Sequence, residues 1–406
     1  MRILHINAIS GIRSTGRSYL DLAEYLNNNG DEGYIAYASG LPYKKGYKIG
    51  KPFEYKIHGL LSRAFGMQAY FSKNGTRNLL SYIDRLDPDL VHLGNLHANF
   101  INLELLLTYL ARKDLPTVLT LHDCWFFTGK CCHYTVDNCY KWQGQCLNCP
   151  RLQKDNPSWF LDRTNKMHRD KKLWLGEIPR LAVVGVSDWL TNEAKKSFLA
   201  SANIVTRIYN WIDYDVFKPV QTFATRKRLG LNRQFVILGV ASGWSNLKGL
   251  DKFIELAGLV SKDVSIVLVG NIKTPVRLPD NIIKIKETHN VNELVEYYSM
   301  ADVFINLSIE ETFGKVTAEA LACGTPAIVI NSTANPELIG DGCGYVVEKD
   351  DAAKVLEHLS NIQKQGKAAY SQYCIEYARK SFNKHDRIHD YIVLYDNLIG
   401  RGFAKC

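Results

Sequence analysis

Strand-like and helix-like segments alternate twice along this chain, and this alternation constrains its fold more than any other feature. In the first run, the apolar segment 3–6 leads through a glycine-bearing loop into residues 18–30, where apolar side chains recur at helical spacing until Gly30. In the second run, which begins at Phe235, four apolar strand-like segments alternate with three helical ones. Because strands alternating with helices form parallel sheets, the sequence predicts an α/β chain with two doubly wound units.

The chain length agrees with two such units. At 406 residues the chain is large enough for two domains, each with a core of its own. The segment 210–230 between the two runs is polar and contains Pro219. We therefore predict one domain over residues 1–215 and a second over residues 216–384. Ligands of doubly wound sheets bind beyond the carboxyl ends of the strands, so the polar residues there are the candidates for a site.

Composition and charge exclude several classes of protein. With 46% hydrophobic and 22% charged residues, the chain has the profile of a globular protein rather than a disordered or coiled-coil one. It contains neither a continuous apolar run long enough for a membrane span nor an N-terminal signal-peptide pattern, so we expect a cytoplasmic protein. The net charge of +9 suits anionic partners such as nucleotides or an acidic membrane surface.

The segment Ser308–Pro326, with the sequence SIEETFGKVTAEALACGTP, carries the most chemical information. A strand is expected to end near Ser308, a glycine-bearing loop follows, and a helix containing Glu319 then runs to Gly324. Free amides and the positive end of a helix favour a phosphate. Carboxylates repel phosphate, so Glu311 and Glu319 should bind sugar hydroxyls instead. A nucleotide-sugar supplies both groups.

The E-x7-E pattern followed by ACGTP resembles the retaining GT-B glycosyltransferases of family 4. Three further segments occur in the same order as in the family, namely LHDCW, NWIDYDVFKP and VASGW followed by KG. The resemblance therefore covers the whole chain. It implies two Rossmann-like domains facing a cleft, the first for the acceptor and the second for the donor, with residues 385–406 packing back on the first domain. The alternative for the two glutamates is a solvated loop residue and a helix-face residue.

The resemblance also implies roles for individual residues. Glu311 would lie near the hydroxyls of the donor sugar and Glu319 would hold the ribose. Lys248 would neutralise the diphosphate of the leaving group. His122 would contact the donor sugar or the acceptor, unless it is a structural histidine paired with Asp123. The expected catalytic residues are His122, Lys248 and Glu311, and the expected donor-binding residues are Gly16, Arg17, Ser242, Gly243, Lys248, Glu311, Phe313, Gly314, Lys315 and Glu319.

One cation of the family pattern is missing. The family usually has an arginine about six residues before the lysine, whereas this chain has Ala241-Ser242-Gly243-Trp244 there. Lys315, an arginine of the first domain, or Trp244 with backbone groups would have to replace it. The sequence also shows no unambiguous general base. Retaining enzymes of this fold do without one, since the leaving phosphate oxygen can accept the proton of the acceptor, and no catalytic metal is expected.

Six of the ten cysteines lie between Cys124 and Cys149. In a chain of this length without a signal peptide, such a cluster indicates metal binding before it indicates disulfides. Cys146 and Cys149 form a C-x2-C pair, and Cys131 and Cys139 could complete a four-cysteine site for structural zinc, with Cys132 and His133 as competing ligands. Unligated reduced thiols and an iron–sulfur or redox role are the alternatives.

Basic and aromatic residues alternate between Lys44 and Arg77, where Glu54 is the one acidic residue. Such a surface suits an anionic bilayer and a lipid-linked acceptor, while the alternative is a solvated loop whose aromatic residues join the core. No nucleic-acid motif accompanies it, and no nucleic-acid partner is expected. The basic residues are Lys44, Lys45, Lys48, Lys51, Lys56, Arg63, Lys73 and Arg77, and the aromatic ones are Tyr47, Phe53, Tyr55, Phe65, Tyr70 and Phe71.

These observations together predict a retaining hexosyltransferase that moves a sugar from a nucleotide-sugar to a glycan acceptor, which we expect to be lipid-linked. The resemblance implies a role in capsule, exopolysaccharide or other surface polysaccharide biosynthesis, at the inner face of the plasma membrane. Two alternatives remain at this level. One is a sugar-nucleotide epimerase of the same fold, and the other is a non-catalytic, metal-stapled protein that binds nucleotides or nucleic acid. A phosphorylase would need a pyridoxal lysine, which the length and the motifs do not support.

Overall fold

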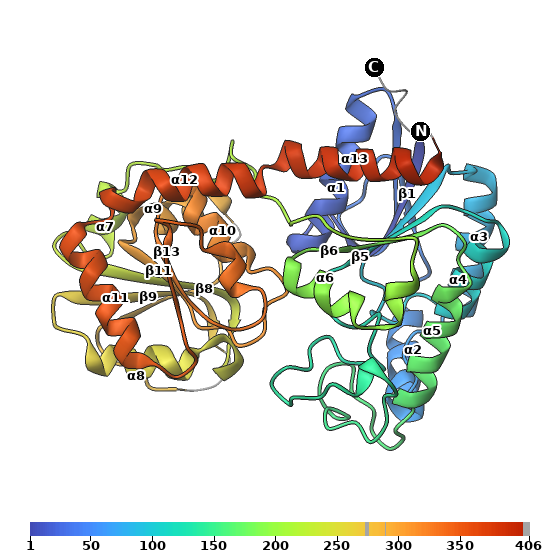
Figure 1. Cartoon of the computed structure of the whole chain (residues 1–406), viewed down its shortest axis with the longest axis horizontal. Coiled ribbons are helices and arrows are strands. Elements are labelled where there is room, and N and C mark those ends of the chain that lie inside the picture. Colours follow the sequence, from blue (N-terminus) through green and yellow to red (C-terminus); the bar gives the residue numbers. More distant parts are fainter. Residues whose placement is uncertain (273–275, 289, 401–406) are drawn as a thin grey trace. The chain divides into compact units, whose positions relative to one another are not determined.

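The computed structural model describes residues 1–272, 276–288 and 290–400 (Figure 1). Two compact units are present. The first comprises Met1–Ile208 together with the described residues from Ile388 onward, and the second comprises Tyr209–Arg387. Each unit contains one parallel sheet flanked by helices, which confirms the predicted fold class.

The first unit is built on a seven-stranded sheet with the order β3-β2-β1-β4-β5-β6-β7. Its strands are β1 (Arg2–Ser10), β2 (Glu32–Gly40), β3 (Gly46–Lys48), β4 (Leu90–Leu93), β5 (Thr117–Leu121), β6 (Leu181–Gly185) and β7 (Ile204–Arg207). Its helices are α1 (Arg13–Asn28), α2 (Pro52–Phe65), α3 (Lys73–Leu86), α4 (Leu103–Arg112), α5 (Thr164–Gly176) and α6 (Asp188–Lys195), with 3-10 turns η1 (Lys141–Gln143) and η2 (Phe198–Ser201). The central strands β4, β5 and β6 are buried on both faces because helices cover both.

The second unit is built on a six-stranded parallel sheet with the order β10-β9-β8-β11-β12-β13. Its strands are β8 (Phe235–Trp244), β9 (Val264–Ile272), β10 (Ile282–Ile285), β11 (Val303–Asn306), β12 (Ala327–Ile330) and β13 (Gly344–Val347). Its helices are α7 (Phe223–Arg228), α8 (Leu250–Leu259), α9 (Val291–Met300), α10 (Lys315–Ala322), α11 (Ala352–Gln365) and α12 (Ala368–Phe382), with 3-10 turns η3 (Asn246–Lys248) and η4 (Asn335–Leu338). The strand order reverses between β8 and β11, where ligands of such sheets bind.

The boundary between the units differs from the prediction. The chain passes into the second unit at Tyr209, seven residues before the expected boundary at residues 215 and 216. The reason is packing, because the ring of Tyr209 contacts Phe313 and Phe382 and the Ile212 amide donates to the Phe382 carbonyl. These contacts anchor the expected linker in the core of the second unit.

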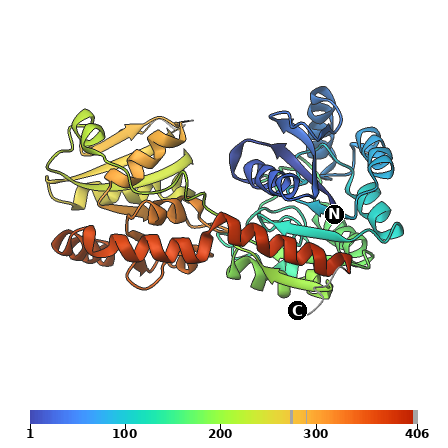
Figure 2. The same ribbon diagram turned by 90° about the horizontal axis from the view of Figure 1, so that it is seen from above.

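The last helix, α13 (Lys384–Ile399), returns to the first unit. From Ile388 on it lies along the sheet of that unit in both views (Figures 1 and 2). The Tyr395 hydroxyl lies 2.7 Å from His92 Nδ1 on β4, and the Tyr391 hydroxyl lies 3.0 Å from Thr120 Oγ1 on β5. The expected packing segment extended to residue 406, and its last six residues lie outside those that the structure describes.

Within the described part of the chain, no helix combines the length and the apolar character that crossing a bilayer requires.

Candidate functional site

The centre of the candidate site in the second unit is an ion pair between two predicted catalytic residues. Lys248 ends the 3-10 turn η3 that follows β8, and Glu311 lies in the loop that follows β11. Lys248 Nζ donates to Glu311 Oε1 at 2.5 Å although 63 residues separate them in the chain. Both side chains are partly exposed. The fold thus joins two motifs at the point where the strand order reverses.

A close backbone approach positions Lys248. Gly249 has φ of +78°, and a Cβ atom there would lie 2.5 Å from the Cβ of Leu307 at the end of β11. The Ile309 amide donates to the Leu247 carbonyl at 3.0 Å. The turn that carries Lys248 is therefore fixed against the loop that carries Glu311.

A buried network of amide side chains shapes the loop from Ser308 to Gly314. Asn306 accepts from the Ser308 amide at 3.1 Å and donates to Asn335 Oδ1 at 3.3 Å. Asn335 in turn donates to the Ser308 carbonyl at 2.9 Å. The Glu311 amide donates to Thr333 Oγ1 at 2.9 Å. The sequence analysis did not identify Asn306, Thr333 or Asn335, and only Asn306, a polar residue in the apolar segment VFINL, offered a usable signal.

Helix α10 begins directly after this loop. Gly314 is its N-cap residue, with φ of +91°, and Lys315 is its first residue. A Cβ atom at Gly314 would lie 2.8 Å from Leu338, so the start of the helix has no room for a side chain there. Glu319 follows on the buried side of α10, where its Oε2 accepts from the Tyr298 hydroxyl at 2.8 Å. Burial, together with the nearby carboxylate, raises the pKa of Tyr298 well above its usual value, so it stays a donor.

Three further predicted donor residues of the second unit are Ser242, Gly243 and Phe313. Phe313 turns its ring into the core against Tyr209 and Phe382, so only its backbone can reach a ligand. Ser242 and Gly243 belong to the last part of β8, close to a break in the pairing register with β9. Ser242 is exposed there. These positions still lie at the carboxyl end of β8.

Trp244 cannot replace the missing arginine, which corrects one of the three expectations. Its side chain is 5% exposed and packs edge-on against Phe253. Its indole Nε1 donates to the Val269 carbonyl at 3.1 Å. The indole donor is therefore used inside the sheet and is turned away from any diphosphate.

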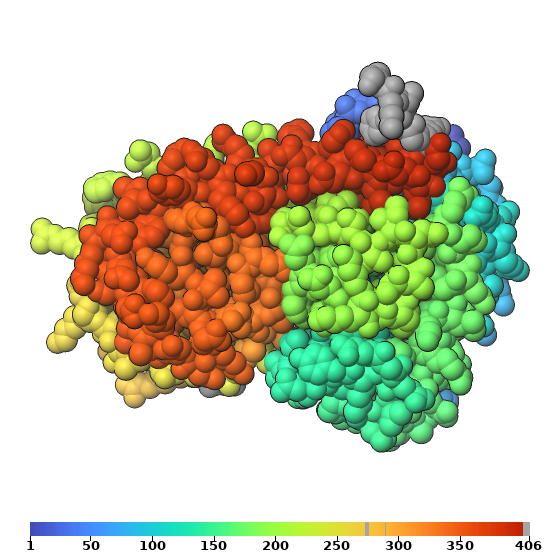
Figure 3. Space-filling view, in the orientation of Figure 1, coloured from blue at the N-terminus to red at the C-terminus, as the bar shows by residue number. Residues whose placement is uncertain are grey.

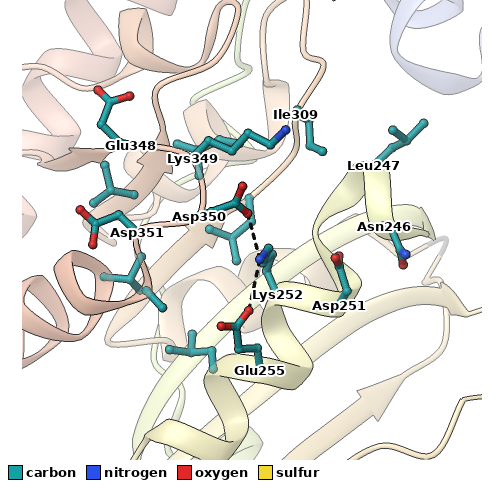
Figure 4. A pocket seen from close by; sticks show the side chains of 16 residues that line it. Asn246, Leu247, Asp251, Lys252, Glu255, Ile309, Glu348, Lys349, Asp350 and Asp351 are labelled. Atoms are coloured by element: carbon teal, nitrogen blue, oxygen red, sulfur yellow. Dashed lines mark hydrogen bonds and ion pairs between the residues drawn. The ribbon is translucent and has the colours of Figure 1, made fainter. Parts of the chain in front are cut away.

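A cavity of about 330 Å³ lies beside this site, between α8 and the start of α11 (Figure 4). Leucine, isoleucine and valine side chains form much of its wall, and at its rim Lys252 bridges Glu255 and Asp350 at 3.2 and 2.9 Å. Of the described residues that line it, none is a predicted donor residue. Its acidic rim does not suit a diphosphate, so we do not place the donor there.

In the first unit, Gly16 and Arg17 lie inside α1 and not in the expected loop. Gly16 is buried, and a Cβ atom there would lie 3.1 Å from Ile9 and 3.3 Å from the Gly11 amide. Its carbonyl accepts from that amide at 3.1 Å. The glycine thus has a packing role, while Arg17 is exposed on the helix.

His122 follows β5 and is partly exposed. Its Nε2 lies 3.3 Å from the Tyr19 hydroxyl on α1. Asp123, its suggested structural partner, instead accepts from His97 Nε2 at 2.9 Å and from the Trp125 amide at 2.8 Å. The neighbouring carboxylate raises the pKa of His97 in spite of its burial, and His97 lowers the pKa of Asp123. Asp123 therefore organises the loop after β5 through His97.

The four predicted metal-ligating cysteines line one small cavity in the first unit. Cys131, Cys139, Cys146 and Cys149 all contribute to its wall, and Cys131 Sγ lies 4.0 Å from Cys149 Sγ. All four are free thiols. The competing ligand Cys132 lies outside this wall and near His97 and Asp123.

Two family models match the chain. Residues 15–216 match Glycosyltransferase Family 4, and residues 221–381 match Glycosyl transferases group 1. Over 194 residues the chain is 28% identical to N-acetyl-alpha-D-glucosaminyl L-malate synthase of Bacillus anthracis. The aligned segment covers 45% of this chain and 50% of that protein. The chain thus matches about half the length of that relative.

Two further matches span more of the chain. The putative colanic acid biosynthesis glycosyl transferase WcaC of Escherichia coli is 20% identical over 319 residues, which is 77% of each chain. The crystal structure of Anabaena HepE in complex with UDP and glucose superimposes with a TM-score of 0.65 at 16% identity and covers 98% of this chain and all of that one. Because the two family models together account for residues 15–216 and 221–381 and this structure shares the fold, the chain belongs to the GT-B glycosyltransferases similar to family 4.

Proposed function

We propose that this protein is a retaining glycosyltransferase that moves a hexosyl group from a nucleotide-sugar to a lipid-linked glycan acceptor in surface polysaccharide biosynthesis. The observation that carries the proposal is the Lys248–Glu311 ion pair at the carboxyl ends of β8 and β11. An ammonium group has three N–H donors, so Lys248 can keep its bond to Glu311 while it donates to phosphate oxygens. Glu311 thereby orients the cation that would stabilise the leaving diphosphate.

The start of α10 supplies the second part of this donor site. The positive end of the helix and the backbone around Gly314 and Lys315 favour an anion next to the Lys248 ammonium. Glu319 lies one turn further along, where its bond from Tyr298 holds the carboxylate in place. In this arrangement Glu319 would accept from ribose hydroxyls and Glu311 from the sugar. His122 would contact the sugar or the acceptor from the first unit.

The proposed chemistry relies on positioning and on charge. The bond between the anomeric carbon and the phosphate oxygen breaks, and the acceptor oxygen forms a new bond to that carbon on the same face. The acceptor proton passes to the leaving phosphate oxygen. Lys248 and the start of α10 stabilise the negative charge that develops on the diphosphate. No protein base is needed for this sequence of steps.

Support for a glycan product comes from relatives and from the donor complexes. The WcaC protein is described as a colanic acid biosynthesis glycosyl transferase, and HepE binds UDP and glucose. The direct test incubates the full chain with nucleotide-sugars and follows nucleotide release and the configuration of the released sugar by NMR. We expect an α-linked donor to give the α-anomer first. Early appearance of the β-anomer would exclude retention, and unchanged turnover in both Glu311→Ala and Glu319→Ala would contradict the assigned donor site. No turnover of any nucleotide-sugar by the wild-type chain would favour a non-catalytic binding protein.

The acceptor side of the proposal rests on the surface of α2. Phe53, Ile57 and Leu60 are exposed and recur on one stripe of this helix, with Lys56 and Arg63 beside them. The Trp159 amide donates to the Arg63 carbonyl at 2.8 Å, which places the exposed Trp159 and Phe160 next to this stripe. An exposed apolar stripe with basic flanks suits the surface of an anionic bilayer.

The structure corrects one alternative for this region. Most of the basic and aromatic residues lie in β3, α2 and α3 rather than in a solvated loop, while the connecting segments hold Lys44, Lys45, Lys51, Tyr70 and Phe71. Some of their aromatic rings pack against other rings of the first unit, and others remain exposed to solvent. Tyr47 stacks on Tyr82 and Tyr70 packs against Trp174, whereas Phe53 and Phe65 remain exposed.

Vesicle sedimentation tests this surface. We expect the full chain to bind vesicles that contain anionic lipid, and Phe53→Ser with Lys56→Ser to weaken that binding at least tenfold. The matched control is Tyr373→Ser, which removes an exposed aromatic residue from α12 in the other unit. Equal binding to neutral and anionic vesicles would remove the electrostatic part of the proposal.

A further inference from the structure

The segment between β5 and α5 is long and almost without regular structure. Residues 122–163 contain the 3-10 turn η1 as their one helical or strand element. In Figures 1 and 3 this segment, coloured teal to green, forms a lobe of its own on the first unit. Structureless segments of this length are uncommon in compact domains and need specific anchors.

Four thiols line one cavity inside this lobe. Cys131, Cys139, Cys146 and Cys149 line a cavity of about 20 Å³, which is the size of one ion or one water molecule. They come from two turns, one at residues 128–132 and one at residues 146–149, with Cys139 between them. We call this space the cysteine cavity.

The geometry suits metal ligation rather than a disulfide. The sulfur atoms of Cys131 and Cys149 are 4.0 Å apart, about twice the length of a disulfide bond. In a tetrahedral zinc site with Zn–S bonds of about 2.3 Å, two ligand sulfur atoms lie about 3.8 Å apart. The observed separation is thus close to one edge of such a tetrahedron.

Hydrogen bonds fix the segments that carry these cysteines. The Gly129 amide donates to Cys146 Sγ at 3.3 Å, a contact that stabilises a thiolate. The Lys141 ammonium donates to the carbonyls of Leu147 and Asn148 at 3.1 and 3.0 Å, so it fixes the turn between Cys146 and Cys149.

Two buried lysines provide the charge that a thiolate cluster needs. Lys130 donates to the carbonyls of residues 151, 152 and 154, and Lys171 donates to the Trp125 carbonyl. Lys130 and Lys171 are each about 2% exposed. Buried cations are costly without anions, and zinc bound by four thiolates carries a charge of −2.

We propose that Cys131, Cys139, Cys146 and Cys149 bind one Zn²⁺ ion that fixes the lobe between β5 and α5. Binding converts four thiols to thiolates, so that four Zn–S bonds form and four protons leave to solvent with no change of oxidation state. Binding requires the sulfur atoms to come closer together, because among the described residues no three of these four lie within 4.8 Å of one another. The ion has a structural role, because all four coordination positions are filled by protein.

A neighbouring group of side chains is the rival location. Among the described residues, ligand atoms of His97, Asp123 and Cys132 lie within 4.8 Å of one another. This group mixes nitrogen, oxygen and sulfur ligands, and its histidine and aspartate already bond to each other at 2.9 Å. Four thiols are the better match for zinc, and single substitutions separate the two locations.

The test measures metal in the full chain purified under reducing conditions without chelator. We expect about one equivalent of zinc, lost in Cys146→Ser and Cys149→Ser and kept in Cys132→Ser. Cys374→Ser, at a buried thiol of the second unit, controls for general effects of losing a cysteine. Replacement by Co²⁺ should give the absorption of a tetrahedral site with strong thiolate-to-cobalt charge transfer. If the ligand variants do not fold, the wild-type cobalt spectrum and faster proteolysis of residues 122–163 in chelator decide the question.

Three outcomes would overturn the proposal. The first is less than about half an equivalent of metal with no uptake of zinc or cobalt. The second is loss of zinc in Cys132→Ser with retention in Cys149→Ser, which would place the ion at His97, Asp123 and Cys132. The third is iron in place of zinc, or a Cys131–Cys149 disulfide found by mass spectrometry. Glycosyl transfer is not needed for any of these readouts.

Discussion

At the scale of single residues, Lys248 tests the donor site. Lys248→Met removes the cation but keeps the length of the side chain. We expect turnover to fall about 100- to 1000-fold, since a group that stabilises a developing charge is lost. Lys252→Met is the matched control, because Lys252 lies in the same region but bonds to Glu255 and Asp350. Nucleotide release, measured at saturating donor, checks both variants, and a loss of equal size in Lys252→Met would contradict the assignment.

His5 on β1 offers a test of the core of the first unit. It is fully buried, and neither ring nitrogen has a hydrogen-bond partner among the described residues. Burial lowers the pKa of His5 from 6.5 to about 3. The imidazole of His5 therefore binds a proton near pH 6.5 in the unfolded chain but stays neutral in the folded chain. As a result, the free energy of unfolding decreases as the pH falls from 6.5 toward 3.

The variant His5→Phe should remove this part of the pH dependence. At pH 5.5 the linkage amounts to about 1.4 kcal/mol, and at pH 7.5 it is close to zero. Urea unfolding of both proteins at the two pH values measures the difference. We expect wild type to lose about that much more stability than the variant, and parallel losses would show that His5 does not stay neutral in the fold.

At the scale of elements, the junction between η3 and α8 holds the lysine in place. Gly249→Ala forces a side chain into a left-handed conformation and against Leu307. We expect a loss of about 2 to 3 kcal/mol in unfolding free energy and a fall in turnover, because Lys248 shifts from Glu311. Gly258→Ala in α8 is the control, since a Cβ atom there meets nothing within 4 Å. It should be neutral or stabilising by up to about 1 kcal/mol, and equal behaviour of the two variants would contradict the argument.

The helices and strands also show which parts of the fold and of the site can be predicted from the sequence alone. β8, β9, β11 and β12 were predictable because strands buried on both faces are continuous apolar runs. The edge strands β3, β7, β10 and β13 are short and partly exposed, so their patterns were weak. Motif and loop positions indicated Lys248, Glu311 and Glu319. Their partners were not predictable, since the bond of Tyr298 to Glu319 and the inward turn of Trp244 depend on tertiary packing.

At the scale of the whole molecule, α13 joins the end of the chain to the first unit. The Tyr395 hydroxyl and Thr120 Oγ1 lie 2.7 Å from the two ring nitrogens of the buried His92. Tyr395→Phe leaves one of these nitrogens without its partner, so we expect a loss of about 1 to 3 kcal/mol and faster hydrogen exchange in α13. Tyr373→Phe, at an exposed position of α12, is the control and should change neither. Unchanged exchange in Tyr395→Phe would show that this contact does not hold the helix.

The central claim is that the second unit binds a nucleotide-sugar through Lys248 and the start of α10. The most direct measurement is the thermal unfolding of wild type and Lys248→Met with a panel of UDP-, GDP-, ADP- and TDP-sugars. We predict that one nucleotide class raises the unfolding temperature of wild type, with about 2.7 kcal/mol of stabilisation at a hundredfold excess over Kd, and stabilises Lys248→Met much less. No shift with any nucleotide-sugar, or equal shifts in both proteins, would contradict the account.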